Sequence, residues 1–245
     1  MTLQATAWNP LAVMTSLDAQ LLAQTAERVA AHSGPTFLIG IAGGVAVGKT
    51  TLAHRLAEGL NRGGITVEVV ATDGFLRPNR ELEAAGLNLR KGFPETYDRD
   101  AFHRFLAELG AGRAAASPVY SHVTYDIVPG EVRRVPARGV VIVEGVNVLQ
   151  TPQARAAFGL SLYVDADPAD AKAWYLARLA RIVAEEPESF IARIADPVRR
   201  DALVEAAWTQ INLVNLRDHI APTMAHADVV VRKRPDHALQ ALAWR

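Results

Sequence analysis

The sequence predicts an α/β protein in which helices cover both faces of a mostly parallel sheet. Short runs rich in valine, isoleucine and leucine alternate with amphipathic segments along its 245 residues, the pattern expected where strands and helices alternate. A glycine-rich turn separates the first apolar run from the amphipathic segment that follows it. No internal repeat or change in composition marks a linker, so we expect one domain over residues 1–245.

The expected elements follow in a regular order through the first half of the chain. Leucine, alanine and valine on one face predict a helix that stops at Gly34-Pro35, within an N-terminal helical extension of residues 1–35. A polar stretch with three glycines and two prolines predicts a long loop. Asp98 is placed to cap the next helix, which ends at Gly110. The ranges are helix 16–32, strand 36–42, helix 50–60, strand 65–71, loop 72–96 and the helix after Asp98.

The second half continues the alternation. Weak alternation over 118–135 predicts either a hairpin or an irregular excursion, and the pair Asp167-Pro168 marks a helix start. Two long helices, over about 168–217, form an expected helical lid or substrate region at the end of the sheet where such folds bind ligands. The ranges are strands 139–143, 160–164 and 229–231, and helices 168–185 and 198–216.

The composition excludes several classes of function. Twenty-six basic and twenty-six acidic residues cancel, so no overall field favours nucleic acid or an anionic membrane as partner. Cysteine is absent, which excludes disulfides, thiolate zinc sites and cysteine nucleophiles. The first nine residues lack the pattern of a signal peptide, and no apolar run reaches the roughly 18 residues that span a bilayer. We therefore expect a cytoplasmic protein without nucleic-acid or membrane partners.

One motif predicts that the protein binds a nucleoside triphosphate. The pattern G-x-x-x-x-G-K-[ST] occurs between the first strand and the next helix, as a phosphate-binding loop requires. Its backbone N–H groups and lysine bind phosphates, while the hydroxyl binds Mg²⁺. The alternative is a glycine-rich turn without a ligand. We assign nucleotide binding, with ATP and Mg²⁺ as cofactors, to Gly43, Gly44, Val45, Ala46, Val47, Gly48, Lys49, Thr50 and Thr51.

A carboxylate follows each of two predicted strands, at the sheet edge where the phosphates are expected. Asp73 is a candidate base that takes the proton of an attacking hydroxyl, although an Asp-Gly turn is an equally good interpretation. Glu144 follows the strand 139–143 and is a candidate Mg²⁺ ligand together with Thr50, with a solvated strand end as its alternative.

Several longer segments resemble the type I bacterial pantothenate kinases, members of the P-loop kinase superfamily. The match runs in order from about Phe37 to the C-terminus and is more specific than the phosphate loop alone. Its segments are TDGFL (72–76), RKGFPETYD (90–98), PVYSHVTYD (118–126), VEGVNVLQ (143–150), WYLAR (174–178), WTQINLVNL (208–216) and IAPT (220–223).

The resemblance implies a P-loop kinase fold and an enzyme that phosphorylates the primary hydroxyl of pantothenate with ATP. The product would be 4'-phosphopantothenate, in the first step of coenzyme A biosynthesis. Such enzymes are typically homodimers restrained by coenzyme A. The resemblance assigns Asp73 as the catalytic carboxylate, Arg178 to the transferring phosphoryl group, His237 to adenine, and His122, Tyr125, Tyr175 and Asn212 to the pantothenate chain.

The residues by themselves leave alternatives open. Tyr175 and Arg178 share one face of a predicted helix and are able to close over the substrates, yet helix packing and a solvated charge also explain them. His122 is equally an ordinary loop histidine, and Asn212 a helix-surface amide. For Arg90 and Lys91, a solvated pair of loop charges and a phosphate contact both fit.

Three features depart from the family pattern. The segment before the phosphate loop is shorter than usual. The helix after Arg178 carries aliphatic residues (179–183) where the family tends to place phenylalanines, which favours a different tail or substrate. His54 replaces an arginine that contacts the phosphates of coenzyme A, which predicts weak feedback control.

The sequence therefore leaves three alternative functions. The first is a pantothenate kinase, and the second is a related kinase that acts on a nucleoside, a sugar or another small alcohol. The third is a nucleotide-dependent switch. Guanine-specific switches usually carry N-K-x-D, which this sequence lacks, and a switch has no need of an acceptor base.

Overall fold

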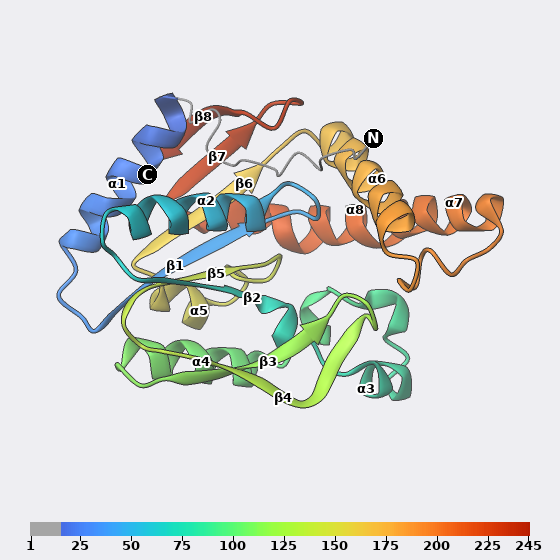
Figure 1. Ribbon diagram of the computed structural model, residues 1–245, viewed down its shortest axis with the longest axis horizontal. Coiled ribbons are helices and arrows are strands. Elements are labelled where there is room, and N and C mark those ends of the chain that lie inside the picture. Colours follow the sequence, from blue (N-terminus) through green and yellow to red (C-terminus); the bar gives the residue numbers. More distant parts are fainter. Residues whose placement is uncertain (1–15) are drawn as a thin grey trace, which may run out of the picture.

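The computed structural model describes residues 16–245 and contains a six-stranded sheet (Figure 1). The strand order is β2-β5-β1-β6-β7-β8, and all neighbours pair in parallel except β8, which runs antiparallel to β7. The mostly parallel sheet predicted from the sequence is confirmed. Its strands are β1 (Thr36–Gly43), β2 (Val67–Ala71), β5 (Gly139–Glu144), β6 (Leu160–Asp165), β7 (Val229–Lys233) and β8 (Leu239–Trp244).

Helices cover both faces of this sheet, as predicted. The helices α1 and α2 lie on one face and α4 and α5 on the other, while α6 and α7 lie beyond the carboxyl ends of the strands (Figure 1). The helices are α1 (Ser16–Ala30), α2 (Lys49–Arg62), α3 (Asn79–Ala84), α4 (Arg99–Gly110), α5 (Pro152–Ala157), α6 (Pro168–Glu185), α7 (Pro197–Ala206) and α8 (Leu213–Asn215). Residues 1–15 of the expected N-terminal extension lie outside the described residues.

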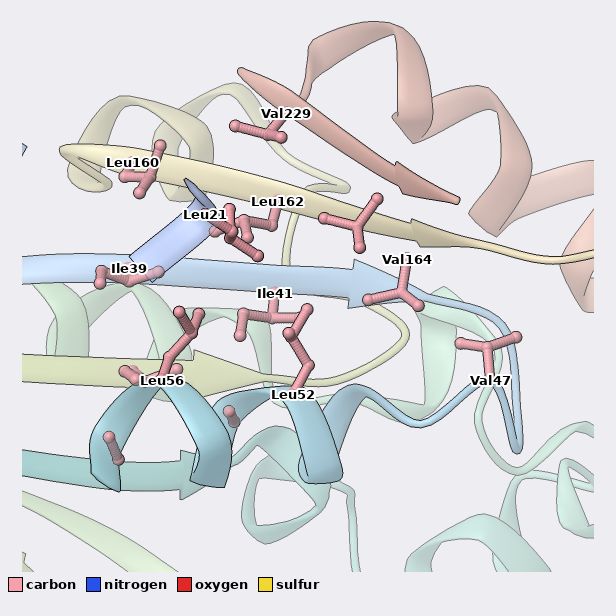
Figure 2. Packing of buried hydrophobic residues seen from close by; sticks show 14 of the residues in the cluster. Leu21, Ile39, Ile41, Val47, Leu52, Leu56, Leu160, Leu162, Val164 and Val229 are labelled. Carbon is pink, nitrogen blue, oxygen red and sulfur yellow. The ribbon is translucent and has the colours of Figure 1, made fainter. Parts of the chain in front are cut away.

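The alternation of side chains along β1 divides the core into two layers. Ile39 and Ile41 point to the face covered by α1 and α2, whereas Leu38 and Ala42 point to the opposite face. Figure 2 shows Ile39 and Ile41 close to the leucines that α2 presents to the sheet. Because both faces are buried, the central strands are mostly apolar, with Ser161 in β6 as an exception that donates to Asp228 Oδ2 at 2.7 Å. This explains why short runs of apolar residues predicted these strands correctly.

The expected long loop over 72–96 is only partly a loop. It contains α3 and three single turns of 3₁₀-helix, namely η1 (Thr72–Phe75), η2 (Asn88–Arg90) and η3 (Pro94–Thr96). The start of α3 is held by a distant segment, because the Asn79 backbone N–H donates to Asp126 Oδ1 at 2.9 Å. A contact between residues 47 positions apart leaves no local signal, so glycine and proline content dominated the prediction.

The region 118–135 forms a hairpin, one of the two possibilities left open by the sequence. Its strands, β3 (Ala115–Ser121) and β4 (Asp126–Val135), pair antiparallel in a separate two-stranded sheet. The strand β8 was not predicted. Its residues Leu-Gln-Ala-Leu-Ala-Trp favour helix as much as strand, and pairing with β7 decides the conformation.

Helix starts were predicted more accurately than helix ends. Asp98 accepts a hydrogen bond from the Ala101 N–H at 2.8 Å, and Asp167 accepts one from Ala169 at 2.9 Å. The second long helix is less regular than expected, because α7 continues through π-helical turns on both sides of α8 as far as Ile220. No helix within residues 16–245 is long and apolar enough to cross a membrane.

Candidate active site at the carboxyl ends of the strands

The phosphate-binding loop connects β1 to α2 and is tightly curled. Ala46 and Gly48 both adopt left-handed backbone conformations, with φ angles of 64° and 87°. A left-handed angle is unusual for alanine and is a form of strain found at functional sites. Backbone turns of this kind form concavities that bind anions. The Lys49 side chain folds back over the loop, and its Nζ donates to the Gly44 carbonyl oxygen at 2.7 Å.

Three charged side chains from distant parts of the sequence act on Lys49. Burial lowers the pKa of Lys49, the carboxylates of Glu144 and Asp73 oppose this shift, and the Arg178 guanidinium adds to it. These residues come from the ends of β5 and β2 and from α6. The structure therefore brings together the lysine, both candidate carboxylates and the candidate arginine at one edge of the sheet.

Thr50 and Glu144 form an oxygen-rich pair beside the loop. The Thr50 hydroxyl donates to Glu144 Oε1 at 2.7 Å, and Glu144 is only 6% exposed. Mg²⁺ prefers oxygen ligands and is commonly held by one or two carboxylates together with phosphates of the substrate. No cluster of three or more His, Cys, Asp or Glu residues able to hold a metal occurs in the described part of the chain. The pair fits a metal that arrives with a nucleotide.

Asp73 lies in η1, directly after β2, and close packing holds this segment. The Thr72 hydroxyl donates to Asn147 Oδ1 at 2.6 Å. A Cβ atom on Gly145 would overlap the Thr72 hydroxyl oxygen, and one on Gly74 would overlap the Pro118 carbonyl oxygen. Both glycines are thus required by close approach of neighbouring segments, which sets the position of Asp73.

Two tyrosine hydroxyls, those of Tyr97 and Tyr120, lie close enough to Asp73 to be affected by its charge. Burial raises the pKa values of the Tyr97 and Tyr120 hydroxyls, and the negative charge of Asp73 raises both further. Tyr97 is 2% exposed. These hydroxyls stay protonated at neutral pH and are available as hydrogen-bond donors in the space next to Asp73.

Four of the residues assigned to substrate binding, Tyr125, Tyr175, Arg178 and Asn212, lie close to one another. The Tyr175 hydroxyl lies next to the Asn212 side chain, which lowers its pKa, but burial dominates and raises the pKa of Tyr175 to about 12. Tyr125 and Arg178 both act electrostatically on Tyr175, and Arg178 also acts on Tyr125. The helix α6 and the hairpin between β3 and β4 therefore face each other across the same space.

The tip of this hairpin is tied to the segment 79–91, which sequence analysis did not predict. Lys91 Nζ donates to Asn79 Oδ1 at 2.6 Å and to the Tyr125 carbonyl oxygen, and the Asn79 amide donates to the same oxygen at 3.1 Å. Arg90 instead pairs with Glu95 on the surface. Arg90 is therefore a surface charge, as one of the two interpretations predicted. Lys91 matches neither, because its ammonium group donates hydrogen bonds that connect segment 79–91 to the hairpin tip. Lys91 lies in the segment RKGFPETYD, whose match to the family was the only sequence signal that it has a role.

The two histidines assigned from the resemblance have different surroundings. His122 is exposed at the hairpin turn, and its ring lies 5.2 Å edge-on from Tyr120. The structure records no contact between His122 and the four clustered acceptor residues. His237 lies in the turn between β7 and β8 with a φ angle of 67°, and its ring stacks on Trp174 at 4.3 Å. Trp174 thus lies against the candidate adenine-contacting histidine, and sequence reasoning did not assign it a role.

Comparison with known proteins agrees with this geometry. The family model described as "Phosphoribulokinase / Uridine kinase family" matches residues 38–240. The chain belongs to this family. Its curated relatives include the pantothenate kinase of Streptomyces avermitilis, 46% identical over 87% of this chain and 70% of the relative. Another is the pantothenate kinase of Rhizobium rhizogenes, 41% identical over 85% of this chain and 69% of the relative. The resemblance to pantothenate kinases is confirmed.

Solved structures of similar proteins are also kinases of this fold. A candidate fructose transport system kinase from Silicibacter sp. TM1040 superposes with a TM-score of 0.68, covering 88% of this chain and 96% of its own, at 29% identity. The D-glycerate 3-kinase of Cryptococcus neoformans gives a TM-score of 0.67 over 95% of this chain and 100% of its own, at 13% identity, and shows the shared fold alone. This family member is an ATP-dependent phosphotransferase.

The crowding at Gly145 yields a prediction about stability. Substitution Gly145→Ala should lower the free energy of unfolding by about 1–3 kcal/mol, because the added methyl group displaces Thr72 from Asn147. Denaturant unfolding monitored by circular dichroism measures this change. Gly110→Ala is the matched control, since a Cβ there meets nothing within 4 Å, and it should be neutral or stabilising by up to about 1 kcal/mol. Equal stability of the two variants would contradict the prediction.

Proposed function

We propose that this kinase transfers the γ-phosphoryl group of ATP to the primary hydroxyl of pantothenate and forms 4'-phosphopantothenate. The observation that supports this most directly is the convergence of Lys49, Asp73, Glu144 and Arg178 next to the Tyr175–Asn212 pair. A phosphoryl donor site and a site rich in hydrogen-bonding groups are thus adjacent. Relatives that are 40–46% identical over most of the chain carry the name pantothenate kinase.

Each charged residue has a defined role in this proposal. The loop amides and Lys49 hold the β- and γ-phosphates, and Asp73 accepts the proton of the pantothenate hydroxyl as its oxygen attacks the γ-phosphorus. The bond between the γ-phosphorus and the bridging oxygen breaks, and ADP leaves. Arg178 stabilises the charge on the equatorial oxygens. Mg²⁺, held by Thr50 and Glu144, would neutralise charge on the phosphates when bound.

The acceptor site is suited to a polar, weakly charged molecule. Pantothenate offers a carboxylate, an amide and two hydroxyl groups, which need donors and acceptors more than strong charge. Tyr175 keeps its proton at neutral pH, because its pKa is raised to about 12, so its hydroxyl both donates and accepts. In the proposal Tyr125, Tyr175 and Asn212 bind the pantothenate chain, and the resemblance assigns His122 to it as well.

The nucleotide base is assigned to the ring of His237. Trp174 covers one face of this ring at 4.3 Å, and in the proposal adenine packs against the opposite face. Indole and imidazole rings form a rigid stack, so the histidine is held in place for base binding.

A second acceptor is favoured by one departure from the family pattern. The part of α6 that follows Arg178 presents aliphatic side chains at Leu179, Ile182 and Val183, all partly buried. An aliphatic lining accommodates a different tail on the same reacting hydroxyl. A small alcohol other than pantothenate is therefore the second candidate, and a nucleotide switch without an acceptor is the third.

A coupled assay of ADP release against a panel of alcohols tests the proposed acceptor. We expect release to be stimulated by pantothenate and abolished when Mg²⁺ is removed by chelation. The panel contains pantothenate, pantothenate derivatives with altered tails, nucleosides, D-glycerate and simple sugars. Stimulation by another alcohol alone would replace pantothenate with that acceptor, and no stimulation by any acceptor would favour the switch.

Replacement of the proposed base gives the next prediction. Asp73→Asn should lower turnover at least about a hundredfold, because a neutral amide no longer accepts the proton. The affinity for ATP should stay nearly unchanged, because the phosphates are bound by the loop. Steady-state kinetics and titration calorimetry measure the two quantities separately. Turnover like that of the wild type would exclude Asp73 as the base.

The response to coenzyme A is the third functional prediction. His54 is exposed on α2 and lines an open groove with residues of β2 and β4, including Arg133. Without the arginine of the family at this position, we expect inhibition only at millimolar coenzyme A, by ordinary competition with ATP. An inhibition curve measured at several ATP concentrations checks this, and potent inhibition at low micromolar coenzyme A would contradict it. The homodimer, the single domain and the cytoplasmic location stay predictions.

A further inference from the structure

A second buried lysine, Lys233, contacts the backbone of the phosphate loop. Lys233 lies at the end of β7 and is 9% exposed. Its Nζ donates to the Val47 carbonyl oxygen at 3.1 Å. A Cβ atom on Gly48 would lie only 2.6 Å from the same nitrogen. The ammonium group therefore packs directly against the two loop residues that precede Lys49, which gives Gly48 a steric role in addition to its conformational one.

This contact lies where the loop is most curled. Val47 stands between Ala46 and Gly48, which have the left-handed φ angles of 64° and 87°. Backbone in such conformations persists only where its surroundings hold it. The Lys233 ammonium group, by donating to the Val47 carbonyl oxygen between these two residues, supplies such support.

Lys233 also contacts the helix that carries proposed acceptor residues. Its Nζ lies 5.3 Å from the centre of the Trp174 ring, within the range of a cation–π interaction. Trp174 precedes Tyr175 in α6, stacks on His237, and donates from Nε1 to the Pro235 carbonyl oxygen at 3.1 Å. One ammonium group thus connects the phosphate loop, helix α6 and the turn between β7 and β8.

The charge of Lys233 is unfavourable for stability. Burial lowers its pKa to about 8; Arg55 on α2 lowers it further, whereas Asp18 on α1 opposes the shift. Asp18 itself pairs with Arg55 at 3.6 Å, and Lys233 in turn lowers the pKa of His237. A buried lysine with incomplete charge compensation is often less stable than an apolar side chain of the same length. A role in binding explains its presence better than a role in folding.

We propose that Lys233 is a positioning residue for the nucleotide, which holds the phosphate loop in its binding conformation and connects it to helix α6 through Trp174. This inference rests on the proposed binding of ATP at the loop, but it does not depend on which alcohol is the acceptor. Binding of Mg²⁺ and ADP, measured without any acceptor, therefore tests it separately from the proposed function.

The central variant is Lys233→Met, which keeps the unbranched shape of the side chain, shorter by its terminal atom, and removes its charge. We expect the dissociation constant for ADP with Mg²⁺, measured by titration calorimetry, to rise about tenfold, the effect typical of losing one charge-assisted hydrogen bond. The KM for ATP should rise by a similar factor, with kcat within about threefold of the wild type. Lys172→Met is the matched control, because Lys172 is a partly exposed lysine on α6 that pairs with Glu205; its ADP affinity should stay unchanged.

Thermal unfolding separates positioning from a merely structural role. At pH 7 the melting temperature of Lys233→Met should equal or exceed that of the wild type, since a buried charge is removed. Between the folded pKa of about 8 and the ordinary value of 10.5, the unfolded chain binds more protons than the folded one. The wild type therefore gains stability as pH rises through this window, and the variant should lack this gain.

A second variant tests the connection to α6. Trp174→Leu should also weaken ADP binding, and the double variant should lose less affinity than the sum of the two single losses, because both act through one unit. Three results would overturn the inference: unchanged ADP affinity in Lys233→Met, a lowered melting temperature with equal losses in kcat and affinity, or additive effects in the double variant. If Lys233→Met does not fold, unchanged ADP affinity in Trp174→Leu overturns it equally.

Discussion

The burial of the Lys49 ammonium group is the constraint on which the rest of the site depends. Removing a charge from water is unfavourable unless hydrogen bonds and opposite charges replace the lost hydration. Here the Gly44 carbonyl oxygen accepts a hydrogen bond from Nζ, and Glu144 and Asp73 supply negative charge. The shift of its pKa below the ordinary value shows that this compensation is incomplete. A triphosphate bound at the loop would complete this compensation, so the unmet charge of Lys49 lies where the ligand is expected to bind.

The surroundings of Lys49 are held by contacts that leave little freedom. Gly145 and Gly74 allow segments to approach so closely that a methyl group at either would overlap a neighbour. Lys91 and Asn79 donate hydrogen bonds to the Tyr125 carbonyl oxygen at the hairpin tip, and Tyr175 lies next to the Asn212 side chain. Side chains fixed in this way need little reorganisation when substrates bind, which is the main requirement for phosphoryl transfer, where positioning and charge stabilisation do most of the chemistry.

Much of this could be predicted from sequence, for identifiable reasons. The central strands are buried on both faces and therefore form short, mostly apolar runs, and the phosphate loop has a motif whose residues are adjacent. Asp73 and Glu144 directly follow strands, so their position at the sheet edge followed from topology. In contrast, α3 and the roles of Lys91, Trp174 and Lys233 could not be predicted, because each depends on a partner tens of residues away. The strand β8 was missed for another reason: its residues favour helix as much as strand, and pairing with the adjacent strand β7 decides its conformation.

The sequence alone determined the order of the central strands and main helices, the phosphate loop and the family, because these depend on local periodicity and on residues that stand next to one another. Only the tertiary structure decided which charges meet. Lys49 is influenced by charged groups from η1, the end of β5 and α6, and Lys233 reaches the Val47 carbonyl oxygen across 186 positions of chain. Such contacts arise when strands separated in sequence become neighbours in the sheet, and side-chain periodicity along one segment carries no information about them.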